Sequence, residues 1–208
     1  MSPTTAVLVI DPYNDFIAPL GKGWPLIRAL AKEVRLIDNL KRVLADARRR
    51  EISVVYAPHS RYRRGKGRDV KWPNPSQFLV RLSKFFADGH YGGRFRTDLA
   101  PAPGEFVASE HAISSGFGGT DLDQHLRSIG AEHLVVCGLL TNTCVESTVR
   151  HAGDLGYMVT VLNDGVAAWS HEDHAAALDA RDPADHSAAA GSRRGADRAA
   201  DARRRSRR

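Results

Sequence analysis

Five short runs of apolar, largely β-branched residues recur along the chain, and longer amphipathic segments separate them. The runs cover residues 6–10, 52–57, 105–109, 133–139 and 158–163. Their near-continuous apolarity is typical of strands that are covered on both faces, as the strands of a parallel sheet are. The sequence therefore predicts a parallel sheet with helices packed on both sides of it.

The segments between the runs have helical periodicity. Residues 25–50 place apolar side chains at steps of three or four, which predicts one long helix that begins with a proline. Residues 120–130 predict a short helix with Thr120 as its N-cap and Gly130 just past its end, and residues 142–156 predict another. Strands that alternate with helices indicate a doubly wound α/β fold.

The end of the chain differs from the rest in composition. Residues 181–208 contain nine Arg and four Asp, so they carry +5 of the net charge of +6, and they contain no aromatic residue and no Leu, Ile, Val or Met. Such a segment cannot bury enough apolar surface to become ordered. We expect one domain in residues 1–180 and a disordered, low-complexity tail in residues 181–208. A basic arm is the alternative reading of the tail, but the nearly neutral body predicts no nucleic-acid partner.

The sequence gives no sign of export or of membrane insertion. The N-terminus has no basic region followed by an apolar one, and no apolar run approaches the ~18 residues that a membrane span requires. The two cysteines, Cys137 and Cys144, have no metal-ligand spacing and predict no disulfide framework. We expect a cytoplasmic protein with no membrane partner.

Polar residues follow the predicted strands, where the ligand crevice of a doubly wound sheet lies. They are Asp11, His59, Glu110 with His111, the segment from Thr141 to Cys144, and Asp164. Asp11 is a candidate base or orienting group, although an Asp before Pro also commonly starts a turn.

Cys144 falls in the first turn of a predicted helix, whereas Cys137 falls inside a strand and is expected to be a core residue. Unpaired N–H groups and the helix dipole in a first turn favour an anion, which predicts a lowered thiol pKa and a nucleophile. The same N–H groups could hold an oxyanion. From its position alone, Cys144 is better explained as a small buried side chain without reactivity.

Residues 59–77 form a basic segment without periodicity, which predicts a long loop. It is either a lid over the crevice or a solvated surface loop. Its cationic side chains would suit a substrate carboxylate if they line the crevice; they are Arg61, Arg63, Arg64, Lys66 and Arg68.

Three motifs together resemble those of the isochorismatase-like cysteine hydrolases. "VLVIDPYNDF" (7–16) is similar to the opening strand and D-x-Q-N-D-F motif of that family, and "SSGFGGTDLDQHL" (114–126) is similar to its S-x-F-x-x-T-x-L-x-x-L segment. "GLLTNTCVESTVRHAGDLGY" (138–157) resembles its nucleophile region. The motifs occur in the family's order and extend from residue 6 to about residue 178. The resemblance implies a Rossmann-like fold of three layers, with a mostly parallel sheet between helices.

The resemblance also implies a catalytic triad of Asp, Lys and Cys. The Asp falls on Asp11 and the Cys on Cys144, but the Lys position falls on His111, so this role is assigned to His111, with Glu110 as a possible companion. His cannot simply replace an ammonium ion, because it is not permanently charged. A non-proline cis peptide is implied between Leu139 and Leu140, and it would aim the N–H groups of Leu140 and Cys144 at the substrate oxygen.

The candidate substrate-binding residues are Phe16, His59, Trp72, Phe117 and Thr141. Nicotinamidases of the family bind a metal through Asp-x-His and a further His, and His59 stands here without either partner, so no metal and no cofactor are expected. We expect a small-molecule substrate and a homo-oligomer. The implied activity is hydrolysis of a small amide-like C–N bond through a thioester. Two alternatives are vinyl-ether hydrolysis, whose enzymes typically lack the Cys, and a degenerate family member that acts as a binding subunit.

Overall fold

The structure is a computed structural model. It describes residues 3–64, 78, 80, 82–112 and 114–179. The predicted tail (181–208) and most of the predicted loop lie outside the described residues, and so do Lys66, Arg68 and the substrate-binding candidate Trp72. No helix among the described residues has the length and apolarity that crossing a bilayer requires.

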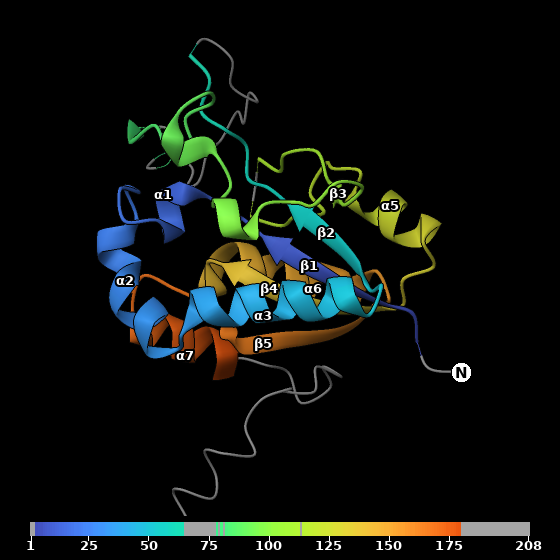
Figure 1. The fold of residues 1–208 in the computed structure, drawn as a ribbon. Coiled ribbons are helices and arrows are strands. Elements are labelled where there is room, and N and C mark those ends of the chain that lie inside the picture. Colours follow the sequence, from blue (N-terminus) through green and yellow to red (C-terminus); the bar gives the residue numbers. More distant parts are fainter. Residues whose placement is uncertain (1–2, 65–77, 79, 81, 113, 180–208) are drawn as a thin grey trace, which may run out of the picture.

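A five-stranded parallel sheet forms the centre of the fold (Figure 1). The strands are β1 (Thr5–Ile10), β2 (Ser53–Ala57), β3 (Phe106–Val107), β4 (His133–Leu139) and β5 (Met158–Ala167). Their order across the sheet is β3-β2-β1-β4-β5, and every neighbouring pair is parallel. The predicted doubly wound α/β fold is confirmed, and the strand order reverses direction between β1 and β4. Ligands of such folds bind at this reversal, beyond the carboxyl ends of the strands.

Helices cover both faces of the sheet. They are α1 (Asn14–Ile17), α2 (Trp24–Glu33), α3 (Leu36–Arg49), α5 (Leu122–Ser128), α6 (Glu146–Asp154) and α7 (His171–Asp179), with short turns η1 (Tyr91–Gly93), η2 (Thr97–Leu99) and η3 (Thr141–Val145). Side chains of a strand alternate between two cores. In β1, Val7 and Val9 join the core beneath α2 and α3, whereas Leu8 and Ile10 join the core beneath α5 and α6.

The prediction of one helix over residues 25–50 is wrong, because the segment folds as α2 and α3. Arg35 lies between the two helices with a φ of 55°, a left-handed conformation that ends a right-handed helix. The side-chain amide of Asn39 donates to the Val34 carbonyl at 2.8 Å and so satisfies the end of α2. Leu26, expected in the apolar stripe, is 62% exposed.

Two strands differ in length from the predicted runs. β3 has only two residues, although the N–H of Ala108 continues the pairing with Tyr56 at 2.8 Å. β5 extends beyond the predicted end because a register shift opposite Val136 and Gly138 accommodates extra residues. Asp164 therefore lies within β5 on an exposed part of the strand, and the prediction that it follows the strand is wrong.

The predicted helix over residues 142–156 consists of two parts. Its first turn, η3, is a π-helical turn, and α6 continues from it. Such turns are rare and occur frequently at functional sites. Before α5, the hydroxyl of Thr120 accepts the N–H of Leu122 at 3.4 Å, and Gly130 takes a positive φ just past the helix. Gly130 therefore lies where the sequence predicted, but the N-cap of α5 is Asp121, so the prediction of Thr120 as N-cap is wrong.

Candidate active site

Asp11 lies at the reversal of the sheet, directly after β1. It has a φ of 50°, which is uncommon for a residue other than glycine, and its side chain is completely buried. On the neighbouring strand, Gly138 has a φ of 119°, and a Cβ there would lie 2.0 Å from the carbonyl oxygen of Ile10. Only glycine therefore permits β4 to approach β1 this closely. This approach brings the turn after β4 next to Asp11.

One oxygen of the Asp11 carboxylate is held by two donors. Oδ1 accepts the backbone N–H of His59 at 2.6 Å and lies 3.2 Å from Nε2 of His111. Oδ2 is buried and has no hydrogen-bond partner among the described residues. The carboxylate is therefore fixed through Oδ1, and Oδ2 is available to a group that enters the site.

His59 and His111 lie side by side beyond the ends of β2 and β3. Their backbones form a parallel bridge, in which the N–H of His111 donates to Pro58 and the N–H of Ser60 donates to His111, both at 2.9 Å. The two imidazole rings meet edge to face with centroids 5.1 Å apart. Burial lowers the pKa of His59, so this ring is neutral around pH 7.

Cys144 is the fourth residue of η3, and only 9% of its surface is exposed. Burial raises the pKa of its thiol well above the usual value, and the Asp11 carboxylate raises it further. The expectation that the first turn lowers this pKa is therefore wrong, because desolvation and a neighbouring anion outweigh the helix dipole. In the free protein the thiol carries its proton.

Asp11, His111 and Cys144 meet in one buried cluster. A carboxylate oxygen, an imidazole nitrogen and the sulfur lie within 4.8 Å of one another. These are also atoms that could bind a metal ion. The peptide bond between Leu139 and Leu140, at the start of the turn that carries Cys144, is cis. The structure thus brings together the three candidate catalytic residues, and their roles stay predictions.

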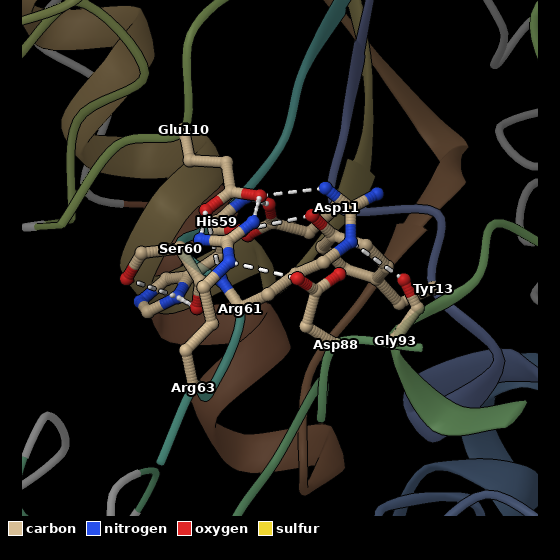
Figure 2. A network of polar contacts seen from close by, with 9 residues as sticks. All are labelled: Asp11, Tyr13, His59, Ser60, Arg61, Arg63, Asp88, Gly93 and Glu110. Atoms are coloured by element: carbon tan, nitrogen blue, oxygen red, sulfur yellow. Dashed lines mark hydrogen bonds and ion pairs between the residues drawn. The ribbon is translucent and has the colours of Figure 1, made fainter. Parts of the chain in front are cut away.

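The carboxylate of Glu110 binds two arginines (Figure 2). It accepts the backbone N–H of Arg61 at 3.1 Å and the guanidinium of Arg61 at 2.6 Å, and it accepts two N–H groups of Arg63 at 2.7 and 2.9 Å. Burial alone would raise the pKa of Glu110, but the hydrogen bonds from Arg63 and Arg61 outweigh it and hold the pKa at about 2. Glu110 is therefore ionised and bound to Arg61 and Arg63, and its role beside His111 stays a prediction.

The remaining contacts of the two arginines complete a clamp, which we define as Glu110, Arg61, Arg63 and Asp88. Arg63 also pairs with Asp88 at 2.8 Å, and the Arg61 guanidinium lies 5.2 Å from the centre of the Tyr13 ring. These pairings conflict with the suggestion that Arg61 and Arg63 bind a substrate carboxylate, because both are already neutralised. Glu110 lies 47 and 49 residues away from them in sequence, so no local pattern could have revealed the clamp.

The other substrate-binding candidates lie in different surroundings. Phe16 packs against Phe86 and Trp169 in the core beneath α2 and α3, and Phe117 packs near Tyr157 in the opposite core. Both act as packing residues in this structure. Thr141 is buried at the start of η3.

The hydroxyl of Thr141 lies 2.9 Å from Nδ1 of His174 in α7. Sequence reasoning missed His174, because its contact crosses 33 residues. The only local signal was the "HEDHAAAL" segment, which indicates no more than a helix.

Comparison with known proteins agrees with the fold. The family model for the isochorismatase domain matches residues 5–189. The ureidoacrylate amidohydrolase RutB of Caulobacter segnis is 33% identical over 175 residues, a match that covers 77% of this chain and 71% of the relative.

Solved structures give the same result. A cysteine hydrolase from Pseudomonas syringae pv. phaseolicola superposes with a TM-score of 0.64 at 30% identity, covering 81% of this chain and 75% of the other. N-carbamoylsarcosine amidase from Thermoplasma acidophilum superposes with a TM-score of 0.65 at 27% identity, covering 85% and 92%. With a family model that spans most of its length and relatives that share its fold, this chain belongs to the isochorismatase family.

Proposed function

We propose that this chain, a hydrolase by its family and its amidohydrolase relatives, cleaves a small amide-like C–N bond through a thioester on Cys144. Sγ attacks the carbonyl carbon while its proton passes to Asp11, and the C–N bond breaks as Asp11 returns that proton to the departing amine. Asp11 then takes a proton from water, which attacks the thioester and releases the acid and the free thiol. The thiolate of Cys144 leaves and takes this proton back from Asp11, so the completed cycle returns both residues to their starting states.

The observation that carries this proposal is the arrangement around Asp11. Both donors bind Oδ1, so Oδ2 is the oxygen that can exchange a proton with the thiol and with water. The raised pKa of Cys144 also fits, because a protonated thiol requires a base at the moment of attack.

His111 and the turn after β4 supply the other roles. Nε2 of His111 holds Asp11 in place at 3.2 Å and polarises the base. Leu140 and Cys144 belong to the segment that follows the strand β4 and its cis peptide. We propose that their backbone N–H groups donate hydrogen bonds to the oxyanion that forms on the substrate. Thr141, in the turn that carries Cys144, and His59, whose N–H binds Asp11, are the proposed substrate contacts.

The names of two relatives suggest where to look for the substrate. The amidohydrolase from Caulobacter segnis acts on ureidoacrylate and the amidase from Thermoplasma acidophilum on N-carbamoylsarcosine, and both compounds carry a carbamoyl group on nitrogen. Such a ureido carbonyl is a small, planar electrophile that suits a buried thiol. We therefore propose ureido acids as the first substrate class to test, followed by simple amides.

The test is an activity screen with the purified chain over ureido acids, small amides and vinyl ethers. The Cys144→Ala variant should lose turnover of every substrate that the wild type cleaves, whereas Cys137→Ala, which removes the other thiol, should retain it. Rapid quenching followed by mass spectrometry of the intact protein should show the acyl group on Cys144. Full turnover by Cys144→Ala would overturn the thioester mechanism.

The same screen separates the alternatives. Cleavage of vinyl ethers alone, unaffected by Cys144→Ala, would assign the chain to the other activity of its family. A folded wild type without turnover of any substrate would indicate a binding subunit. A cytoplasmic location and self-association also remain proposals, which fractionation of cells and light scattering would test.

A further inference from the structure

The catalytic cluster has the composition of a zinc site. Asp11, His111 and Cys144 offer a carboxylate oxygen, an imidazole nitrogen and a sulfur within 4.8 Å of one another, and all three side chains are buried. Zn²⁺ binds these three atom types in proteins and commonly takes three protein ligands with a fourth position left open. This composition runs against the sequence-based expectation of no metal, which rested on the missing partners of His59 in a nicotinamidase-type site.

The geometry is close to that of a tetrahedral ion. At Zn–N and Zn–O distances of about 2.0–2.2 Å, two ligands of a tetrahedral zinc lie roughly 3.3 Å apart. Oδ1 of Asp11 and Nε2 of His111 are 3.2 Å apart in the hydrogen bond that the ion would replace, so these two atoms already lie at about the required separation. In such a site the sulfur would lie roughly 3.6 Å from each of these two atoms. It now lies within 4.8 Å of them, so it needs to move closer by about 1.2 Å at most.

A second feature of the site points to a cation. Oδ2 of Asp11 is buried without a hydrogen-bond partner in the part of the chain that the structure describes. Buried carboxylate oxygens nearly always have a donor or a metal as a partner. A dication bound by one carboxylate and one thiolate forms a neutral unit, which is what a buried site tolerates best.

We propose that Asp11, His111 and Cys144 bind one Zn²⁺ ion and that the ion inhibits the enzyme. When Zn²⁺ binds, the thiol of Cys144 releases its proton to solvent, and the sulfur becomes a thiolate ligand with no change of oxidation state. His111 binds through the lone pair of Nε2 with its ring proton on Nδ1, and water takes the fourth position. The inhibition rests on the proposed function, because the ion would occupy the nucleophile and the base together; the binding does not depend on it.

The ligand set selects against the abundant hard cations. Mg²⁺ and Ca²⁺ require oxygen ligands and six or more of them, whereas a set of sulfur, nitrogen and oxygen suits Zn²⁺ and Co²⁺. Mg²⁺ should therefore neither bind here nor inhibit. Comparing the binding of Zn²⁺ with that of Mg²⁺ therefore distinguishes a specific zinc site from a general attraction of cations to a buried carboxylate.

The experiment measures binding without substrate, using full-length protein from which any polyhistidine tag has been removed. Co²⁺ serves as the probe, because a thiolate ligand gives a charge-transfer absorption in the near ultraviolet. The wild type and Cys137→Ser should give this absorption and lose it when one equivalent of Zn²⁺ is added. Cys144→Ser should give none, and Asp11→Asn should bind Zn²⁺ at least tenfold more weakly.

A measurement on the wild type alone guards against variants that fail to fold. Zn²⁺ should protect Cys144 from iodoacetamide, as mass spectrometry of the modified peptide can show, and EDTA should remove the protection. Mg²⁺ should not protect. An unprotected Cys144 at saturating Zn²⁺, or a charge-transfer band that persists in Cys144→Ser, would overturn the zinc site.

Turnover separates this inference from the proposed function. An active enzyme whose Cys144 binds no Co²⁺ would refute the zinc site and leave the hydrolase standing. A chain that binds Co²⁺ through Cys144 but cleaves no substrate would refute the proposed function and leave the site standing. If the chain both binds Zn²⁺ at Cys144 and cleaves a substrate, Zn²⁺ should lower turnover by at least tenfold, and EDTA should restore it.

Discussion

Nε2 of His111 lies 3.2 Å from Oδ1 of Asp11, at the position where the family resemblance implies a lysine. Both side chains are completely buried, so the contact is shielded from solvent. His111 can serve Asp11 either as a hydrogen-bond donor or as a positive charge. These two roles respond differently to substitution.

We predict that the hydrogen bond is what matters. His111→Ala should lower kcat by about 10²-fold, because an oriented group in the site loses its partner. His111→Gln, whose amide can donate to the same oxygen, should stay within about tenfold of the wild type. Steady-state kinetics on the best substrate of the screen gives both values. Equal losses in the two variants would instead indicate that the charge of His111 is required.

The second prediction concerns Asp11 and the thiol. The carboxylate adds to the effect of burial in raising the pKa of Cys144, so Asp11→Asn should lower that pKa while burial still keeps it above the usual value. At pH 8 a lower pKa means a larger thiolate fraction, and alkylation of Cys144 by iodoacetamide should become several-fold faster, about tenfold per unit of pKa. Turnover should nevertheless fall by about 10²–10⁴-fold, because the general base is lost.

A control variant accompanies this measurement. Asp88→Asn removes a carboxylate that contacts Arg63 rather than the thiol, so it should change neither the alkylation rate nor the pH at which alkylation accelerates. Slower alkylation in Asp11→Asn would contradict the prediction. It would mean that Asp11 assists thiolate formation in the free protein as well as during the reaction.

The strands could be predicted from sequence because both of their faces are buried. A run such as residues 133–139 has to be apolar throughout when helices lie above and below it, and that pattern is visible without a structure. The break at Arg35 could not be predicted in this way. One left-handed residue turns the chain, while the apolar steps of three and four continue through it.

The same distinction, between what a local pattern shows and what only the packed structure shows, applies to the candidate site. The closeness of Asp11, His111 and Cys144 could be predicted because each lies within five residues of the end of a strand, and parallel strands bring their carboxyl ends to one edge of the sheet; their catalytic roles came from the family resemblance. The contacts of Glu110 with Arg61 and of Thr141 with His174 could not, because they depend on how loops and the last helix fold back. The raised pKa of Cys144 was missed because its cause, burial, is a property of the packed structure.

The third prediction concerns the stability that the clamp provides. Glu110→Gln removes the charge that neutralises both arginines, and we expect the free energy of unfolding at pH 7 to fall by about 2 kcal/mol, as for other hydrogen bonds to charged groups. The exposed pair of Glu146 with Arg150 on α6 offers a matched control, and Glu146→Gln should change stability by less than about 0.5 kcal/mol. Urea denaturation monitored by circular dichroism measures both.

The difference in unfolding free energy between the wild type and Glu110→Gln should depend on pH in a defined direction. The pKa of Glu110 is about 2 in the folded protein against an ordinary value of 4.5, so its ionised form favours the folded state. That contribution is fully present above the ordinary value and is lost as the pH falls from about 4.5 towards about 2. The stability difference between wild type and Glu110→Gln should therefore shrink over that interval. A difference that grows with acidification would contradict the clamp.

The last prediction concerns His174, which joins α7 to the turn that carries Cys144. Burial lowers the pKa of His174, so a neutral ring shares a hydrogen bond with the buried hydroxyl of Thr141 at 2.9 Å. We expect His174→Ala to lower kcat by about tenfold with little change in KM, since a misplaced nucleophile slows attack more than it weakens binding.

A double-mutant cycle tests whether this effect passes through Thr141. Thr141→Val combined with His174→Ala should be no worse than the more damaging single variant, because both changes remove the same bond. His171→Ala, which removes a largely exposed partner of Glu33 from the same helix, is the matched control and should leave kcat unchanged. Additive losses in the double variant would show that His174 acts on the rest of α7 and not on the nucleophile turn.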